Sequence, residues 1–406
     1  MRTFRSPWVI AVLLLVLRAI LLAVTSDGSR SLHGDEPAYD DVARSLLAGH
    51  GFLYHGEPWI WKPPLWPAVL AGIRSVFGDC LRTTVLFQGL FDAGSTLLIG
   101  LTAHRVVGAR AAWITMAVVA LWPPFLRESR LIQTEPLFTL LVSLTLFLFV
   151  RYVLRPTHRA ALLLGVGAGL AAMIRPNGLM PLAGFLLAWW LLDRRARAHA
   201  LTLVSVALGV LVVISPWTIR NAKVFHTLIP FSSGGGDVFA MGTSVAANGR
   251  WHHVIWVNER TALIRAEEDR VGRTLDVVER DRALLVIGAK RWLEAPGAQL
   301  RLWGLRLWRT LALPLEGTNE WLRFGFAGSL FAIYALALLR LRRGAGEGED
   351  RERLVPVLLL AFCLYALMLS IVASSSRYVE PMRPVPMMLA VSAVLGLWAT
   401  RVSRRN

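Results

Sequence analysis

Long apolar stretches recur along the chain, and most of the polar segments between them are short. The apolar windows approach the ~20 residues that a helix needs to cross the hydrocarbon core of a bilayer. They lie at residues 8–25, 83–104, 109–126, 135–151, 160–174, 178–192, 200–216, 325–341, 354–373 and 384–400. Because these windows lack the polar face of a water-exposed helix, they predict an all-α polytopic membrane protein with about ten transmembrane helices.

A further apolar segment, residues 63–78, is expected to lie in the membrane interface. It is short, opens with two prolines and carries Arg74 in its second half. With this segment excluded from the spans, the arginine-rich joints fall on one side, which the positive-inside rule assigns to the cytoplasm. This predicts a multi-pass protein of the cell (inner or plasma) membrane with both termini cytoplasmic. The window at 8–25 is predicted to be a retained helix, because no clean signal-peptidase site follows it.

Composition changes this picture little. The 406 residues are 55% hydrophobic and 17% charged, with a formal net charge of +17. Much of the positive excess lies in the short inner segments, where arginines orient spans and contact anionic lipids, so membrane lipids are expected partners and nucleic acid is not. The wide separation of Cys80 and Cys363 argues against a disulfide framework or a metal-thiolate site.

Two outer segments are large, and they define three predicted parts of the chain. Residues 1–216 form a transmembrane core that includes the first outer loop, 26–82. Residues 217–324 form an extracytoplasmic loop, helical from about 261 to 309, whose interleaved arginines and tryptophans are typical of interfacial helices. Residues 325–406 hold the C-terminal transmembrane helices.

The polar joints with the least ordinary composition all fall on the predicted outer side. They are GDEPAYDD (34–41), WKPPLWP (61–67), RLIQTEPLF (130–138), IRPNG (174–178), SPWTIRN (215–221) and RYVEPMRP (377–384). Their shared side predicts an extracytoplasmic active site.

Each carboxylate in these joints is open to a structural and a functional interpretation. Asp35 or Glu36 is suited to cap a helix that begins at Pro37, and a carboxylate at the water–lipid boundary is equally suited to accept a proton or hold a divalent ion. Glu128 and Glu135 flank one span junction, and Glu135 is preferred because it enters an apolar window, where an unpaired carboxylate is costly. Asp92, inside a span, is expected to make a structural helix-to-helix hydrogen bond.

The cations of the same joints also have two readings. Lys62 is either an anchor at the lipid headgroups or a contact to a phosphate. Arginines stand beside prolines at four other outer span ends, and a single one would be an anchor. Several that converge would bind phosphate oxygens with paired donors. These arginines are Arg175, Arg220, Arg377 and Arg383.

The order of these motifs resembles one family. GDEPAYDDVARSLLAGHGF, KPPLWP, QTEPLF, IRPNGL, SPWTIRN and RYVEPMRP together are similar to the GT-C membrane glycosyltransferases, in the branch of the dolichyl-phosphate-mannose protein mannosyltransferases and the lipid A aminoarabinose transferases. The resemblance implies a GT-C fold and an inverting glycosyltransferase that uses a polyprenyl-phosphate-linked sugar donor. The acceptor is a glycolipid, a cell-envelope polysaccharide or a protein on the extracytoplasmic face.

The resemblance also implies roles for residues. Asp35 and Glu135 become the acidic residues of the first two outer loops, with Glu36 beside Asp35, and Lys62 becomes the contact to the donor phosphate. The arginines expected to join Lys62 at the phosphate are Arg175, Arg220 and Arg377. Tyr39 and Tyr378, in the same motifs, are expected to contact other parts of the substrate. The resemblance leaves the need for a divalent cation (magnesium or manganese) open, and Asp35 and Glu135 are the expected ligands of such an ion.

Two other classes of protein remain open at this stage. A flippase or transporter of lipid-linked sugars would have a similar number of spans, but such folds usually concentrate polar or broken helices near the midplane, whereas here the charged joints gather at one interface. A non-catalytic assembly subunit would use the outer loop only to bind a partner, and should tolerate substitution of Asp35.

Overall fold

The computed structural model describes residues 5–26, 30–249, 253–312, 320–342, 349–372 and 376–403. Within these residues the protein is helical except for one short antiparallel hairpin, in which β1 (Leu53–Tyr54) pairs with β2 (Glu57–Pro58). Parts of the predicted inner segments, at residues 1–4, 343–348 and 404–406, lie outside the described residues. The all-α prediction is confirmed.

Each of the ten predicted windows coincides with a helix. These helices are α1 (Arg5–Thr25), α4 (Leu81–Val107), α5 (Ala109–Ala120), α7 (Glu135–Leu154), α8 (His158–Ala172), α9 (Leu179–Leu192), α11 (Thr202–Phe225), α16 (Glu320–Arg342), α17 (Glu349–Val372) and α18 (Pro384–Ser403). The largest departure is α11, which continues to Phe225, past the end of its window at 216. Helix α5 ends early, at Ala120, because the prolines at 123 and 124 start a new short helix, α6 (Pro123–Glu128).

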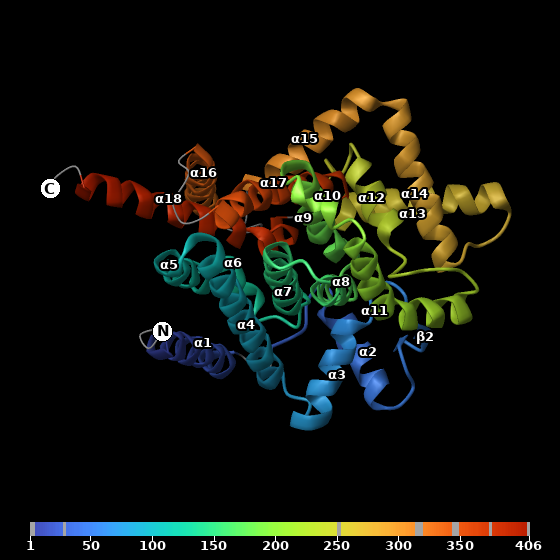
Figure 1. Ribbon diagram of the computed structural model, residues 1–406. Helices are drawn as coiled ribbons and strands as arrows, with labels where there is room; N and C mark the ends of the chain where they lie inside the picture. The colour runs from blue at the N-terminus through green and yellow to red at the C-terminus, as the bar shows by residue number, and fades with distance from the viewer. Residues whose placement is uncertain are drawn as a thin grey trace.

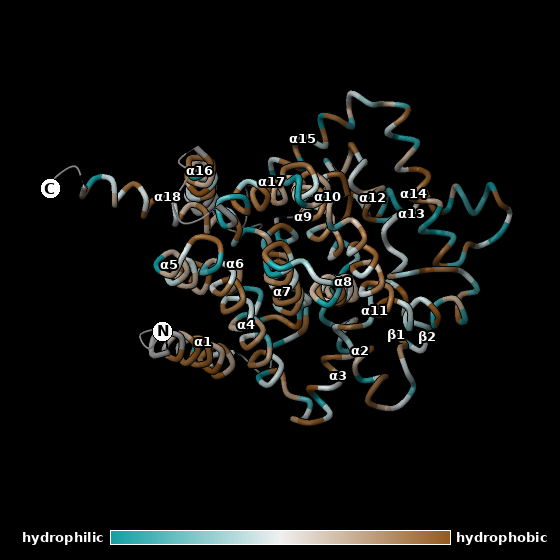
Figure 2. The backbone as a smooth tube through the Cα atoms, viewed as in Figure 1, coloured by the Kyte–Doolittle hydropathy of each residue, from teal (hydrophilic) through white to brown (hydrophobic). Residues whose placement is uncertain are grey.

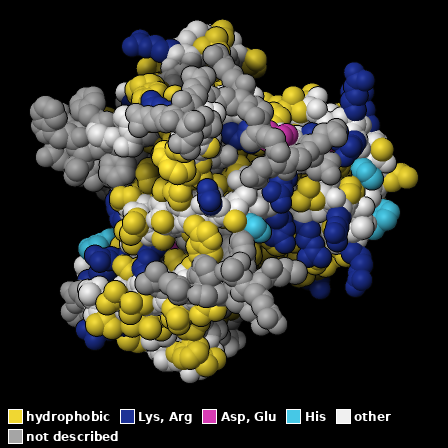
Figure 3. Space-filling model, turned by 60° about the vertical axis from the view of Figure 1, so that its left-hand side comes forward, with side chains coloured by type: hydrophobic (Ala, Val, Ile, Leu, Met, Phe, Trp, Pro, Cys, Tyr) yellow, Lys and Arg dark blue, Asp and Glu magenta, His cyan; other side chains and the backbone are white. Residues whose placement is uncertain are grey.

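Five segments of the described residues are both long and apolar enough to cross a membrane. They are Leu81–Val107, Glu135–Leu154, Thr202–Phe225, Arg351–Val372 and Glu380–Val402, and shorter apolar helices accompany them. Figure 2 shows the hydrophobic character of the bundle helices, and Figure 3 shows a face with many hydrophobic and basic side chains and few acidic ones. The chain is therefore a multi-pass membrane protein, and a total of ten spans stays a prediction.

The remaining elements connect these helices, and all of them except α10 lie at the ends of the helices that hold the candidate site. They are α2 (Glu36–Leu47), α3 (Leu65–Phe77), α10 (Arg195–Ala198), α12 (Gly235–Thr243), α13 (His253–Val271), α14 (Val277–Glu294), α15 (Pro296–Ala312), η2 (Pro176–Gly178), η3 (Ser376–Tyr378) and η4 (Glu380–Met382). In Figure 1, α12 to α15 form a lobe at the right and top of the bundle, and α2 and α3 lie below it.

The main apolar core joins the first outer loop to the bundle. It includes buried side chains of α2, α3, α4, α5, α7, α8, α9, α17 and α18. The pair α8 and α11 packs most closely, because each helix presents a glycine to the other. A Cβ on Gly165 would lie 2.0 Å from the Val206 carbonyl oxygen, and one on Gly209 would lie 2.3 Å from that of Leu162.

Helix α3 lies within the predicted interfacial segment, residues 63–78, and it packs against α2. Its Arg74 is buried and pairs with Asp40 at 2.5 Å and with Asp79 at 3.0 Å. The arginine that argued against a membrane span therefore fastens α3 to α2 and to the link that follows α3.

Two local expectations need correction. Helix α2 begins at Glu36, one residue before the predicted start at Pro37, and Asp35 occupies the N-cap position. No side-chain capping hydrogen bond forms there, because the Asp35 carboxylate is bound by Lys62 instead. In the second outer loop, α15 is not simply an interfacial helix. Its Arg306 is fully buried, and Trp303 Nε1 donates to Ser370 Oγ of α17 at 2.8 Å. One face of α15 thus packs on the bundle, while Trp308 stays exposed.

Candidate active site

Five junctions of the fold bring most of the predicted site residues together. They are the start of α2, the segment before α3, the start of α7, the link between α8 and α9, and η3. Each junction contains a proline close to the functional side chain. The proline ends or starts a helix there, so the side chain lies at one end of the bundle. The group formed in this way is called here the cation cluster; it consists of Asp35, Tyr39, Lys62, Glu135, Arg175, Arg377 and Tyr378.

The first half of the cation cluster is built around Lys62. Its ammonium pairs with the Asp35 carboxylate, and its Nζ lies 4.9 Å from the centre of the Tyr39 ring and 5.8 Å from that of Trp61. Burial alone would lower the pKa of Lys62, but Tyr39 and Asp35 outweigh burial and raise it. Lys62 is therefore a fixed, fully charged cation, with Pro63 and Pro64 limiting the movement of its backbone.

The second half of the cation cluster is built around Glu135. Arg175 donates to Glu135 Oε1 through Nη2 at 2.7 Å and to Thr134 Oγ1 through Nε at 2.7 Å. The Arg377 guanidinium reaches the same Glu135 oxygen at 3.6 Å. The Tyr378 ring lies beneath both guanidinium groups, at 5.0 Å from Arg175 and 5.3 Å from Arg377. One buried carboxylate thus holds two arginines side by side.

The two halves act on each other electrostatically. Burial alone would raise the pKa of Asp35, but Lys62, Arg377 and Arg175 together hold it below its usual value. The cluster brings three cations against the two carboxylates of Asp35 and Glu135, so its centre keeps an excess of positive charge. Such an excess favours an anion with several oxygens, such as a phosphate.

Glu36, the other predicted catalytic carboxylate, has a different environment from its neighbour. It is fully buried, and each of its oxygens accepts two hydrogen bonds. The donors are Arg30, the His33 and Ile132 backbone amides, at distances between 2.5 and 2.8 Å. We therefore assign Glu36 a structural role: it ties the first outer loop to the segment that precedes α7.

Arg220 also departs from the predicted group. Its guanidinium donates to the carbonyl oxygens of Trp59 and Phe52, at 2.7 and 3.3 Å, and packs over the Trp217 ring. These bonds fasten the segment around the hairpin to α11, and they engage both terminal nitrogens of the Arg220 guanidinium. Arg383 is likewise buried in structural bonds, to Glu380, Tyr334 and backbone carbonyls of α15.

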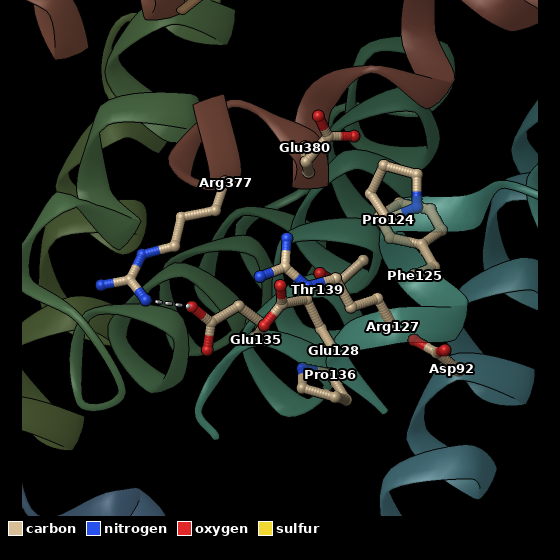
Figure 4. A pocket seen from close by; sticks show the side chains of 10 residues that line it. All are labelled: Asp92, Pro124, Phe125, Arg127, Glu128, Glu135, Pro136, Thr139, Arg377 and Glu380. Atoms are coloured by element: carbon tan, nitrogen blue, oxygen red, sulfur yellow. Dashed lines mark ion pairs between the residues drawn. The ribbon is translucent and has the colours of Figure 1, made fainter. Parts of the chain in front are cut away.

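A small pocket adjoins the cation cluster (Figure 4). It is lined by Asp92, Pro124, Phe125, Arg127, Glu128, Glu135, Pro136, Thr139, Arg377 and Glu380. Sequence reasoning preferred Glu135 over Glu128, and the structure brings both to this pocket. The only sequence signal for Glu128 was a carboxylate beside a span junction, which fits a solvated loop equally well. Asp92, expected to be structural, binds Arg18 of α1 at 2.9 Å.

The residues of the cation cluster do not fit a divalent cation well. Within the described parts of the chain, no group of three or more His, Cys, Asp and Glu side chains is arranged to hold a metal ion. Asp35 and Glu135, the expected ligands, each already face a cationic side chain, Lys62 and Arg175 respectively. A divalent cation would have to displace these groups or be repelled by them.

Comparison with known proteins agrees with this fold. Residues 61–219 match the model of the dolichyl-phosphate-mannose-protein mannosyltransferase family, and this segment includes Lys62, Glu135 and Arg175. An uncharacterized protein of Aquifex aeolicus is 27% identical over 199 residues, which are 47% of this chain and 39% of the relative.

Solved structures of membrane enzymes are similar over nearly the whole chain. The oligosaccharyltransferase AglB of Archaeoglobus fulgidus, in complex with an inhibitory peptide and a dolichol-phosphate, superimposes with a TM-score of 0.56 at 14% identity, over 99% of this chain and 52% of AglB. ArnT of Cupriavidus metallidurans, bound to undecaprenyl phosphate, gives a TM-score of 0.43 at 17% identity over 91% of this chain and 78% of ArnT, too low for structural argument.

The fold is thus that of the GT-C membrane glycosyltransferases, and the expected resemblance is confirmed. The chain spans about half of the AglB structure and less than half of its bacterial relative.

Proposed function

We propose that this protein transfers a sugar from a polyprenyl phosphate to an acceptor hydroxyl at the outer face of the cell membrane, with inversion at the anomeric carbon. The observation that carries the proposal is the convergence of Lys62, Arg175 and Arg377 beside a pocket at one end of the bundle. The acceptor belongs to a glycolipid, a cell-envelope polysaccharide or a protein.

The cations act on the leaving group. When the bond between the anomeric carbon and the phosphate oxygen breaks, negative charge develops on the polyprenyl phosphate, and fixed cations stabilise that charge without reorganising. Glu135 fixes the orientation of the Arg175 and Arg377 guanidinium groups, and each guanidinium has N–H donors left to bond phosphate oxygens. Lys62 adds a point charge from the opposite side of the cluster.

The remaining cluster residues complete the donor site. Tyr378 supports both guanidinium groups with its ring, and the Tyr39 ring lies against Lys62, so the two phenols are suited to contact the phosphate or the sugar. The proton of the acceptor hydroxyl passes to a carboxylate, for which Asp35 is the candidate from the sequence. The donor class is supported by the description of the matched family and by the dolichol-phosphate bound to AglB.

The side of the membrane follows from charge. The joints that form the cation cluster alternate with the arginine-rich joints at the opposite ends of the helices, which the positive-inside rule assigns to the cytoplasm. This arrangement supports cytoplasmic termini and an extracytoplasmic site. A lipid-linked donor dissolved in the bilayer would reach such a site without a nucleotide pocket.

The test is transfer of radiolabelled sugar from a panel of synthetic polyprenyl-phosphate pentoses and hexoses to endogenous acceptors in membranes. Lys62→Met and Arg377→Met should abolish the transfer that the wild type gives. Lys290→Met is the matched control, because Lys290 is an exposed lysine of α14 whose one ion pair among the described residues is with Glu294. If the wild type transfers no sugar, or if Lys62→Met transfers as fast as the wild type, the proposal is wrong. Movement of intact donor across vesicles without transfer would favour a flippase.

A further inference from the structure

We propose that Trp61 binds the sugar of the donor: its indole packs against one face of the sugar ring, while Lys62, the next residue, holds the phosphate to which that sugar is attached. This inference rests on the proposed transfer reaction and deepens it, because it assigns a binding surface to the hexose or pentose ring itself. Asp35 keeps its place as the candidate base.

The position of Trp61 is the first argument. In the short segment that follows β2, successive side chains contact different parts of the molecule. Trp59 is buried in the main core of the bundle, and Ile60 is buried in a smaller cluster with Val278 of α14. Lys62 enters the cation cluster. Trp61 stands between them and is 44% exposed, so its indole is open where the bundle, the lobe of α12 to α15 and the cation cluster meet.

The exposure of this indole differs in kind from that of the other exposed tryptophans. Among the described residues these are Trp190 of α9, Trp308 of α15 and Trp398 of α18. Helices α9 and α18 coincide with predicted spans, and Trp308 packs on Phe331 of α16, a third such helix. Lipid and the membrane interface therefore account for these three indoles. Trp61 lies on no predicted span and adjoins a lysine that is suited to bind phosphate.

The distance between Trp61 and Lys62 suits a sugar phosphate. Lys62 Nζ lies over the Trp61 ring, 5.8 Å from its centre. A phosphate oxygen bonded to this ammonium would lie about 2.8 Å from Nζ. The sugar of the donor is joined to the same phosphorus through a single oxygen. The first ring beyond the phosphate is therefore within contact distance of the indole.

The chemistry of an indole matches that of a sugar ring. One face of many sugar rings carries mainly C–H groups, and contact with an aromatic ring removes this apolar area from water. The C–H groups also meet the negative face of the aromatic π system. A site that pairs such a surface with a few charged groups is typical of small-molecule recognition. Here Trp61 supplies the surface and the cation cluster supplies the charges.

The glycine-rich turn before α12 holds the indole in place. Ser233 N donates to Ile60 O at 2.9 Å, which joins this turn to the segment of Trp61. A Cβ on Gly234 would lie 3.3 Å from both Trp61 Cδ1 and Trp61 O, and Gly234 has a φ of 153°, which favours glycine. A Cβ on Gly235 would meet nothing within 4 Å, so the space beyond this contact is open. The bare backbone of Gly234 thus supports one edge of the indole.

The experiment compares two ligands that differ only in the sugar: undecaprenyl phosphate, and undecaprenyl phosphate that carries each pentose or hexose of the donor panel. Binding to the purified protein is measured from the rise of the unfolding temperature with ligand concentration. Trp61→Leu should weaken binding of the glycosylated lipid by about tenfold and leave that of undecaprenyl phosphate within about twofold of the wild type. Trp61→Phe, which keeps an aromatic ring, should lose less. Lys62→Met should weaken both ligands.

Two further variants control this comparison. Trp398→Leu removes an exposed indole near the far end of α18 and should change the binding of neither ligand. Gly234→Ala places a Cβ against the edge of Trp61 and should weaken the glycosylated lipid alone, by less than Trp61→Leu does. If Trp61→Leu does not fold, Trp61→Phe and Gly234→Ala provide the same test.

Three outcomes would overturn the assignment. Equal weakening of both ligands in Trp61→Leu would show that the indole contacts the lipid or the phosphate. Unchanged binding of both would show that it contacts neither part of the donor. A raised KM for the acceptor with unchanged donor binding would assign the indole to the acceptor. A wild type that binds the glycosylated lipid but transfers no sugar rejects the proposed function, whereas transfer that depends on Lys62 but not on Trp61 rejects this inference alone.

Discussion

Arg175 donates to Glu135 Oε1 at 2.7 Å, across 40 positions of sequence. The pair joins the link between α8 and α9 to the first residue of α7, and both side chains are largely withdrawn from solvent. Because Arg377 reaches the same carboxylate oxygen at 3.6 Å, this pair also positions the third cation of the cluster. The Glu135 carboxylate thus holds Arg175 and Arg377 in place, and the charges of these two arginines stabilise the buried carboxylate.

Replacing Arg175 by methionine should affect both stability and transfer. The variant leaves Glu135 with the more distant Arg377 alone, and removing one partner of a buried ion pair costs about 3–5 kcal/mol. Thermal unfolding in detergent should therefore occur at a lower temperature. The double variant Arg175→Met/Glu135→Leu should recover much of the stability but not the transfer activity. Equal activity in the double variant and the wild type would show that the pair is only structural.

Glu36 and Asp35 should differ sharply in what their substitution changes. Glu36→Gln should lower the free energy of unfolding, because a fully buried carboxylate with four donors becomes an amide that cannot accept from all of them. Asp35→Asn should leave stability nearly unchanged and lower the rate of transfer, because it loosens Lys62 and removes the carboxylate that the proposed function offers as the base. The measurements are thermal unfolding and donor kinetics for both variants; a stable Glu36→Gln variant would contradict the structural assignment.

The buried Glu36 carboxylate also predicts part of the loss of protein stability at low pH. Burial alone would raise the pKa of Glu36, but Arg30 and the backbone amides of His33 and Ile132 hold it below the ordinary value of 4.5. Its contribution to stability is therefore complete above that unfolded value and is lost as the pH falls through the lower folded value. Between these limits Glu36→Gln should show a shallower loss of stability with falling pH than the wild type. Parallel pH–stability curves would exclude this contribution.

The sequence was sufficient to predict the helices and most of the cation cluster, for one physical reason. Hydropathy decides where a chain crosses a membrane, and the prolines beside Lys62, Glu135, Arg175 and Arg377 decide where each helix starts or stops, so both signals are local.

The errors came from features that are not local. Asp35 and Glu36 are neighbours in the chain, but successive residues at a helix start point in different directions. Only the fold brings Lys62 to Asp35, and Arg30 and Ile132 to Glu36. Arg220 has the same sequence setting as Arg175 but meets backbone carbonyls. The pocket at Glu128 exists only because η3 and η4 return from the far end of the chain.

Arg306 offers a test of stability without effect on the site. It is fully buried on α15, and within the described residues none of its guanidinium nitrogens has a hydrogen-bond partner. Burial lowers its pKa to about 10, so it remains charged at neutral pH. Replacing a buried unpaired charge by an apolar side chain of similar length removes a large desolvation cost. Arg306→Met should therefore unfold at a higher temperature than the wild type, whereas Arg309→Met, which loses a bond to the Asn248 carbonyl, should not. A destabilised Arg306→Met would show that the guanidinium has a partner essential to the fold.

The approach of η2 to α8 links the fold to the cation cluster through one glycine. A Cβ on Gly178 would lie 2.4 Å from the Ala171 carbonyl carbon, which is backbone and cannot rotate away. Gly178→Ala should therefore push η2 away from α8 and move Arg175, which immediately precedes η2, relative to Glu135. Because a misplacement of about 1 Å can cost on the order of 10² in rate, transfer should fall strongly even in the fraction that remains folded. Gly72→Ala is the control, since a Cβ there meets nothing within 4 Å and alanine favours a helix. Unchanged kcat in Gly178→Ala would mean that the position of η2 does not govern Arg175.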